Sequence, residues 1–187
     1  MSLKVPEIEP MPRALIHEPL NWLFAEHYRH RQVCLLMEFL AQATVTHSES
    51  METLITFLRE EMPLHLIDEE EDLFPVLRRR LEADDDLERV LGIIREDHNS
   101  HAGRTSELER LLVQCRDQSS PPAFIPDAKA ALIDYAREER RHIALENAVI
   151  LPIARLRLTK PDLEGLSHRL AARRGWVLEE VPVGLSD

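Results

Sequence analysis

A histidine interrupts the apolar stripe of each of four helical segments, and this feature constrains the fold more than any other. Apolar periodicity predicts helices over about 19–44, from the THSES turn to about 81, and over about 84–117 and 124–158. Short breaks separate these segments, so an all-α, antiparallel up-down-up-down four-helix bundle is expected. A short amphipathic fifth helix is predicted within 161–175. The four histidines are His27, His65, His98 and His142.

The four histidines are predicted to lie at one level of the bundle. His27 stands 20 residues before the break near residue 47, and His65 stands 18 residues after it. Because an α-helix rises about 1.5 Å per residue, each hairpin returns the chain close to the level that it left. Glu69 and Glu146 follow a histidine by four residues and share its helix face. Four imidazoles and two carboxylates are therefore expected in one layer of an apolar interior.

A metal centre explains this layer. A lone histidine on an apolar face is more often a hydrogen-bonded core residue, but buried carboxylates without a cation cost several kcal/mol each or become protonated. Six ligands exceed the four of a structural zinc site. Mixed imidazole and carboxylate ligation suits iron, manganese or zinc in a two-metal cluster. Glu69 and Glu146 would bridge the two ions, leaving two histidines for each ion and an open position.

Several neighbouring polar residues are weaker candidates. His30 and His101 follow ligand candidates by three residues, and each is expected beside the ligands, with coordination by His101 as an alternative. Glu70 is a further alternative ligand in an acidic run that is otherwise expected to be solvated. Glu61 and Glu138 lie one turn before the paired histidines, where they would hydrogen-bond the imidazoles or remain surface carboxylates. Residues expected in either the pocket or the core are Tyr28 and Tyr135.

The charge and the cysteine content indicate which classes of partner and which cellular compartment to expect. The net charge of -11 argues against nucleic acid and anionic membranes as main partners, because both are negatively charged. Cys34 and Cys115 are isolated cysteines without a CxxC pattern, which predicts reduced thiols in a cytoplasmic protein. No apolar run is long enough for a membrane span or a secretory signal. The predicted organisation is an N-terminal leader (1–18), the bundle (19–158) and a C-terminal tail (159–187).

The two halves of the bundle repeat each other. The stretch EMPLHLIDEEEDLFP (61–75) parallels EERRHIALENAVILP (138–152), each with Glu-x-x-x-His-x-x-x-Glu and a proline ten residues after the histidine. Upstream, AEHYRH (25–30) parallels EDHNSH (96–101). These motifs resemble the hemerythrin-like HHE cation-binding domain over about residues 15–158. The second half also resembles the di-iron domain of bacterial repair-of-iron-centres proteins.

The resemblance implies a non-haem di-iron site with an Fe-O-Fe type cluster inside the bundle. By motif match it implies the ligands His27, His65, Glu69, His98, His142 and Glu146, with the two glutamates bridging. The chain departs from oxygen-carrying hemerythrins, which have a second histidine on the third helix and an aspartate bridge on the fourth. Ile94, Ala102 and Glu146 stand at the corresponding positions, which argues against simple reversible oxygen transport.

The expected function is that of a hemerythrin-like di-iron protein. It would bind or react with a small molecule such as oxygen, nitric oxide or peroxide, or store and donate iron. An alternative is a metal- or redox-gated sensor or interaction module without catalysis. In that alternative the tail would present an output surface or a homodimer contact.

Overall fold

The computed structural model describes residues 4–178, and within this range the chain is helical without any β-strand. The all-α class, the four long helices and the short fifth helix are as predicted. The first long helix is α1 (Pro19–Leu40). The second consists of α2 (Ser48–Thr56), η2 (Phe57–Glu61), α3 (Met62–Ile67), η3 (Asp68–Leu73) and α4 (Phe74–Arg78). The third is α5 (Glu88–Asp117), the fourth consists of α6 (Pro126–Leu145), η6 (Glu146–Ile150) and α7 (Leu151–Arg157), and the fifth is α8 (Lys160–Arg173).

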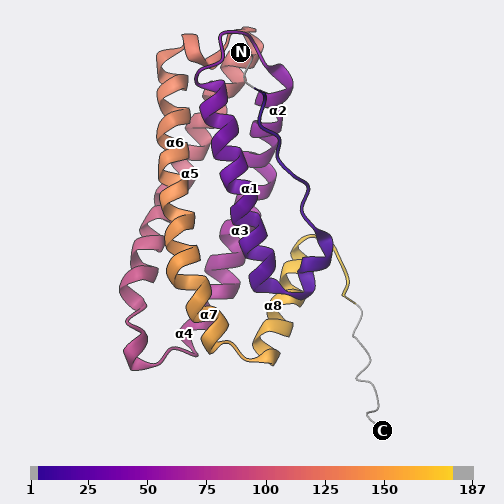
Figure 1. Cartoon of the computed structure of the whole chain (residues 1–187), viewed down its shortest axis with the longest axis vertical. Helices are drawn as coiled ribbons and strands as arrows, with labels where there is room; N and C mark the ends of the chain where they lie inside the picture. The colour runs from indigo at the N-terminus through magenta and orange to yellow at the C-terminus, as the bar shows by residue number, and fades with distance from the viewer. Residues whose placement is uncertain (1–3, 179–187) are drawn as a thin grey trace.

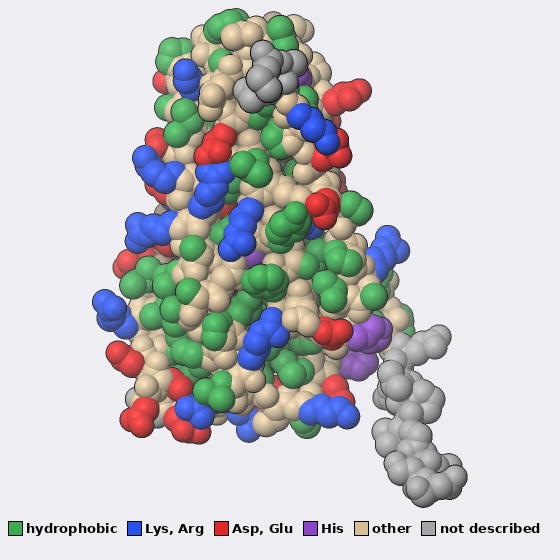
Figure 2. All heavy atoms as spheres, in the orientation of Figure 1, with side chains coloured by type: hydrophobic (Ala, Val, Ile, Leu, Met, Phe, Trp, Pro, Cys, Tyr) green, Lys and Arg blue, Asp and Glu red, His purple; other side chains and the backbone are tan. Residues whose placement is uncertain are grey.

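The long helices run alternately up and down (Figure 1). Helix α1 contacts α2 and α6, and α5 contacts the same two helices, so the four rods form a closed ring. Helix α8 lies against the lower part of α1 and contacts η3 and the short 3₁₀ turn η1 (Arg13–His17). Acidic and basic side chains alternate with hydrophobic ones over the face drawn in Figure 2. Cys34 and Cys115 are free and buried.

Three helix ends differ from the predicted ones by a few residues, and the second long helix ends at Arg78 instead of near residue 81. Helix α1 ends at Leu40, earlier than the predicted position near residue 44. Helix α5 begins at Glu88, because the acidic EADDD run forms its own 3₁₀ turn, η4 (Ala83–Asp85), closed by a capping box. Asp86 then adopts a left-handed conformation with φ 45°, which separates this turn from α5. The acidic run therefore caps η4 and not the long helix.

Three π-helical turns interrupt the second and fourth helices, and each ends two residues before a proline. The turns η2, η3 and η6 precede Pro63, Pro75 and Pro152. A proline in a helix lacks an N–H and clashes with the carbonyl of residue i−4. A π-turn shifts the hydrogen bonding to i+5 and is common at functional sites. A π-turn thus precedes Pro63, and the same arrangement recurs at the two other prolines.

The bundle has two separate apolar clusters with a polar layer between them. The upper cluster includes buried residues between Val33 and Leu40 of α1 and between Leu108 and Cys115 of α5. The lower cluster includes Leu20 and Leu23 at the start of α1, Ile150 and Leu151 near the end of the fourth helix, and Leu166 and Leu170 of α8. All four histidines of the predicted layer fall between the clusters on their own helices. The packing therefore leaves one level of the interior to polar side chains.

Candidate metal centre

The structure brings the six predicted ligands together at this level. They form two groups whose nitrogen and oxygen atoms lie within 4.8 Å of one another, and each group is able to hold a metal ion. Both groups contain the buried carboxylates of Glu69 and Glu146. The first group adds His27 and His65, and the second adds His98 and His142.

The ring Nε2 atoms converge on the two carboxylates. His27 Nε2 lies 3.4 Å from Glu69 Oε1 and 3.3 Å from Glu146 Oε2. His142 Nε2 lies 3.2 Å from Glu146 Oε1. In the second group the Nε2 atoms of His98 and His142 are only 2.9 Å apart. Each carboxylate thus faces histidines of both groups, as a bridging ligand would.

The π-turns carry the two carboxylates. Glu69 lies in η3 and Glu146 is the first residue of η6, each four residues after its histidine. The proline that ends each motif therefore has a structural role, because it accompanies the widened turn that presents the glutamate. The histidines themselves lie in regular α-helix.

The outward-facing nitrogen of each histidine has its own hydrogen-bond acceptor. His27 Nδ1 lies 2.8 Å from Asn147 Oδ1, and His98 Nδ1 lies 2.8 Å from Glu70 Oε1. Because these partners accept hydrogen bonds, the proton is placed on Nδ1 and the Nε2 lone pair faces the layer. The other two histidines are held in the same way. His65 Nδ1 lies 3.2 Å from Glu26 Oε2, and His142 Nδ1 lies 3.5 Å from Asp97 Oδ2.

These partners follow the internal repeat. In each half, the acid directly before the first histidine accepts a hydrogen bond from the histidine of the next long helix. Glu26 on α1 does this for His65, and Asp97 on α5 does it for His142. The residue after Glu69 or Glu146 contacts the histidine Nδ1 of the opposite half, as Glu70 and Asn147 do. The centre therefore has an approximate two-fold arrangement in both its inner and its outer contacts. Glu70 contacts the Nδ1 side of His98, which assigns it to the outer contacts.

The inner atoms fit a metal pair because their polar groups are otherwise unpartnered. Nε2 of His27 and His65, Oε2 of Glu69 and both carboxylate oxygens of Glu146 are buried and lack a partner with hydrogen-bond geometry within the described residues. Such atoms cost about 1–3 kcal/mol each when left unsatisfied, and more when charged. Cations bound between the carboxylates would remove this cost, and imidazole with carboxylate is a donor set that iron, manganese and zinc accept.

Charge coupling inside the layer shifts the pKa values of its members. Burial alone would lower the pKa of His65, but the carboxylates of Glu69 and Glu26 outweigh it and raise that pKa to about 10. For His142, burial is outweighed mainly by Glu146, and its pKa rises to about 9. The imidazoles of His65 and His27 hold the pKa of Glu69 below its usual range despite burial. Imidazolium and carboxylate therefore compensate each other wherever a metal does not.

A second buried polar cluster lies beside the metal layer. His30 Nδ1 is 2.7 Å from Glu139 Oε1, and His101 Nε2 is 2.8 Å from the Tyr135 hydroxyl. Thr105 contacts both His101 and Tyr135. In contrast to the inner layer, the polar atoms of these side chains are matched to one another. This arrangement places His30 and His101 in the hydrogen-bonded surroundings of the centre, outside both four-residue groups.

The remaining weaker candidates lie away from the imidazoles. Glu61 pairs with Arg29 and Glu138 pairs with Arg104, so of the two alternatives these glutamates are surface carboxylates and do not accept hydrogen bonds from the paired histidines. Tyr28 is 48% exposed and does not line the layer, whereas Tyr135 is buried against His101. The residues that sequence reasoning missed are the acceptors Glu26, Asp97 and Asn147, and the buried Glu139.

Replacing Asn147 with leucine is expected to weaken metal binding by about 10- to 100-fold, the usual effect of losing a hydrogen-bond partner of a ligating histidine. The substitution leaves the fully buried Nδ1–H of His27 without an acceptor. Metal affinity is measured by competition with a chelator of known strength. Asn99→Leu is the matched control, since Asn99 also neighbours a predicted ligand but is exposed on α5. Equal affinities in the two variants would contradict the assigned role.

Comparisons with known proteins agree with this geometry. The family model described as "Hemerythrin HHE cation binding domain" matches residues 18–154, a range that contains all six inner side chains. An uncharacterized protein of Haemophilus influenzae is 26% identical over 178 residues, covering 89% of this chain and 96% of that protein. No solved structure matches the chain. Within residues 4–178, none of the helices has the length and apolar character needed to cross a membrane. The chain belongs to the hemerythrin HHE cation-binding domain family.

Proposed function

We propose that the layer binds two iron ions, with His27 and His65 on one ion, His98 and His142 on the other, and Glu69 and Glu146 bridging them. The observation that carries the proposal is the convergence of six buried side chains whose inner atoms are largely unpartnered. Two histidines and two shared carboxylates per ion leave coordination positions open. Iron in such a site supplies reversible one-electron chemistry and binding of small ligands.

The proposed ligand is a small molecule such as oxygen, nitric oxide or peroxide. The four histidines are no more than 8% exposed, so the layer excludes large substrates. A cavity of about 110 Å³ lies beside His142, lined by charged and polar side chains that include Asp97, His101 and Glu139. A cavity of this volume accommodates a ligand of a few atoms and is far below the usual size of organic-substrate pockets.

The chain's own residues would prepare the site in three ways. The Nδ1 acceptors orient the four imidazoles so that the lone pairs of Nε2 face inward. The two apolar clusters above and below the layer limit the access of water. His101, held by Tyr135 and Thr105, forms a fixed wall of the cavity beside His142, and the half-exposed carboxylate of Asp97 would face a polar ligand there.

The test combines metal analysis with optical spectra of the oxidised, reduced and nitric-oxide-treated protein. About two iron atoms per chain and a ligand-dependent change in the visible spectrum are expected. The double variant His65→Ala, His142→Ala is expected to lose the metal and the spectral response, because it removes one imidazole from each group. Fewer than about one metal per chain in the purified and reconstituted protein, or metal retained by the double variant, would refute the proposal.

A further inference from the structure

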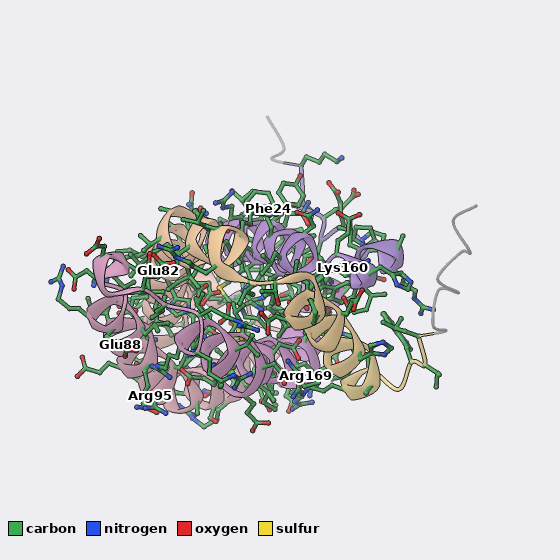
Figure 3. All side chains as sticks on the ribbon, turned by 90° about the horizontal axis from the view of Figure 1, so that it is seen from below. Phe24, Glu82, Glu88, Arg95, Lys160 and Arg169 are labelled. Carbon is green, nitrogen blue, oxygen red and sulfur yellow. The ribbon has the colours of Figure 1, made fainter. Side chains whose placement is uncertain are left out.

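Helix α8 lies beyond the residues that the family model matches, yet its C-terminal end reaches the surroundings of the metal layer. The match ends at residue 154, and α8 covers Lys160–Arg173. The helix begins with a capping box formed by Thr159 and Asp162. Seen along the bundle in Figure 3, it lies at one side of the ring, between the labelled Lys160 and Arg169. This helix therefore packs on the bundle from outside the range that the family model matches.

Two arginines at the end of α8 bind buried acids of the bundle. Arg174 Nη2 donates to Glu26 Oε1 at 2.8 Å and to Asp68 Oδ2 at 2.6 Å. Arg173 donates to Asp68 and, at 2.6 Å, to Asp72 Oδ2. The three acids are at most 8% exposed. The Arg174 side chain is itself 10% exposed and stacks over Trp22, 4.8 Å from the ring centroid.

Two of these acids, Glu26 and Asp68, lie next to the inner side chains. Glu26 uses its second carboxylate oxygen, Oε2, to face Nδ1 of His65 at 3.2 Å. Asp68 directly precedes Glu69 at the start of the π-turn η3. The Glu26 carboxylate therefore lies between the Arg174 guanidinium on one oxygen and the His65 ring on the other.

The equivalent position in the other half lacks this support. Asp97 is the counterpart of Glu26 in the repeat, and its Oδ2 lies 3.5 Å from Nδ1 of His142. The Asp97 side chain is 37% exposed and lines the cavity beside His142. Only the half that contains His65 is enclosed by α8. Helix α8 and Arg174 thus give the two otherwise similar halves different surroundings.

We propose that Arg174 is a positioning residue of the metal centre, which acts through Glu26 on His65 so that the His27 and His65 half holds its ion more tightly than the other half. This inference rests on the proposed function, because it assumes that both halves bind metal. Arg174 would do so by fixing the Glu26 carboxylate between its own guanidinium and the His65 ring. Removing the guanidinium frees a buried carboxylate to rotate, and the imidazole loses its fixed orientation.

The test follows the release of iron from the loaded full-length protein to an excess of ferrous chelator without oxygen. The wild type is expected to release its two ions in a fast and a slow phase. Arg174→Gln is expected to speed the slow phase by about 10- to 100-fold and leave the fast phase unchanged. A merely structural role would accelerate both phases together, because loss of the fold opens both halves.

The matched control is Arg169→Gln. Arg169 also anchors α8 to η3, with Nε 2.6 Å from Asp72 Oδ1, but it does not contact Glu26. This control is expected to leave both phases unchanged. Arg174→Lys is expected to keep the slow phase close to its wild-type rate, because a single nitrogen of Arg174 makes both contacts and an ammonium group can replace it. Arg173 still holds Asp68 and Asp72 in the Arg174 variants, which keeps α8 docked.

A second variant keeps the inference falsifiable if Arg174→Gln does not fold. Glu26→Gln leaves an oxygen beside His65 but removes the charge that Arg174 orients, and the same acceleration of the slow phase is expected. The double variant is expected to be no faster than either single variant, since both remove one shared arrangement. Additive effects, or equal release by Arg174→Gln and Arg169→Gln from protein that holds two ions, would overturn the inference. Protein without metal would instead refute the proposed function.

Discussion

Replacing Glu69 with glutamine is expected to abolish the binding of both ions, whereas Glu71→Gln is expected to leave metal content unchanged. Glu69 belongs to both groups of inner side chains and is buried. A neutral amide in its place removes the one negative charge that the two ions would share and disrupts the bridge. Glu71 lies two residues away in the same acidic run, but its side chain is 70% exposed. The two variants therefore separate a buried ligand from a solvated carboxylate of the same sequence.

The loss of metal is expected to appear in stability as well as in composition. A ligand present at a thousandfold above its Kd stabilises the folded state by about 4 kcal/mol. For a domain of this size that corresponds to a rise in Tm of roughly 8 to 16 °C. Addition of iron is expected to raise the Tm of wild type and of Glu71→Gln but not that of Glu69→Gln. A metal-dependent rise of the same size in Glu69→Gln would show that this carboxylate is not shared between the ions.

The number of residues between each histidine and the nearest chain break is sufficient to predict the layer, because every residue of a helix adds the same rise along the bundle axis. His27, His65, His98 and His142 each fall between the two apolar clusters, as equal distances from the chain breaks require. The differences of a few residues at the end of α1 and the start of α5 do not affect the predicted layer. They change the length of each helix without rotating its buried face. The all-α bundle was likewise predictable from periodicity.

The acceptors behind the histidines were not predictable from helical phase. Glu26 directly precedes His27, so the two side chains point about 100° apart around α1, and Glu26 meets the histidine of a neighbouring helix. Only the packing of two helices shows such a contact. A signal did exist in the repeat, because an acid precedes both His27 and His98. The acceptors of His65 and His142 lie on the preceding helix, whereas Glu61 and Glu138, one turn before these histidines, pair with arginines.

The π-turns and the role of α8 depend on tertiary structure in the same way. A proline ten residues after each paired histidine is visible in the sequence, but periodicity alone does not show that the helix continues through a widened turn. The amphipathic pattern of α8 predicts a helix and not the place where it docks. Arg173 and Arg174 acquire their roles only when that end of the helix meets Glu26 and Asp68.

Metal affinity is expected to rise steeply with pH between about pH 6 and 8. In the chelator-treated protein the carboxylates raise the pKa of His65 to about 10 and that of His142 to about 9, so both rings carry a proton across this range. A coordinating imidazole must be neutral, and metal binding therefore releases these protons. Release of one proton for each ion bound makes the apparent affinity for that ion rise by about 10-fold per pH unit. Competition with a chelator at several pH values measures the slope, and an indicator dye in weak buffer counts the protons.

The stability of the chelator-treated protein is expected to change in the opposite direction. The pKa values of His65 and His142 in the folded chain exceed the unfolded value of about 6.5, so their charged pairs with the carboxylates stabilise the fold. This contribution is complete below about pH 6.5 and is lost as the pH rises through about 9 to 10. Raising the pH should thus lower the Tm of the chelator-treated protein while it strengthens metal binding. A metal affinity that does not vary between pH 6 and 8 would contradict this coupling, because it would mean that the imidazoles bind metal without first losing protons.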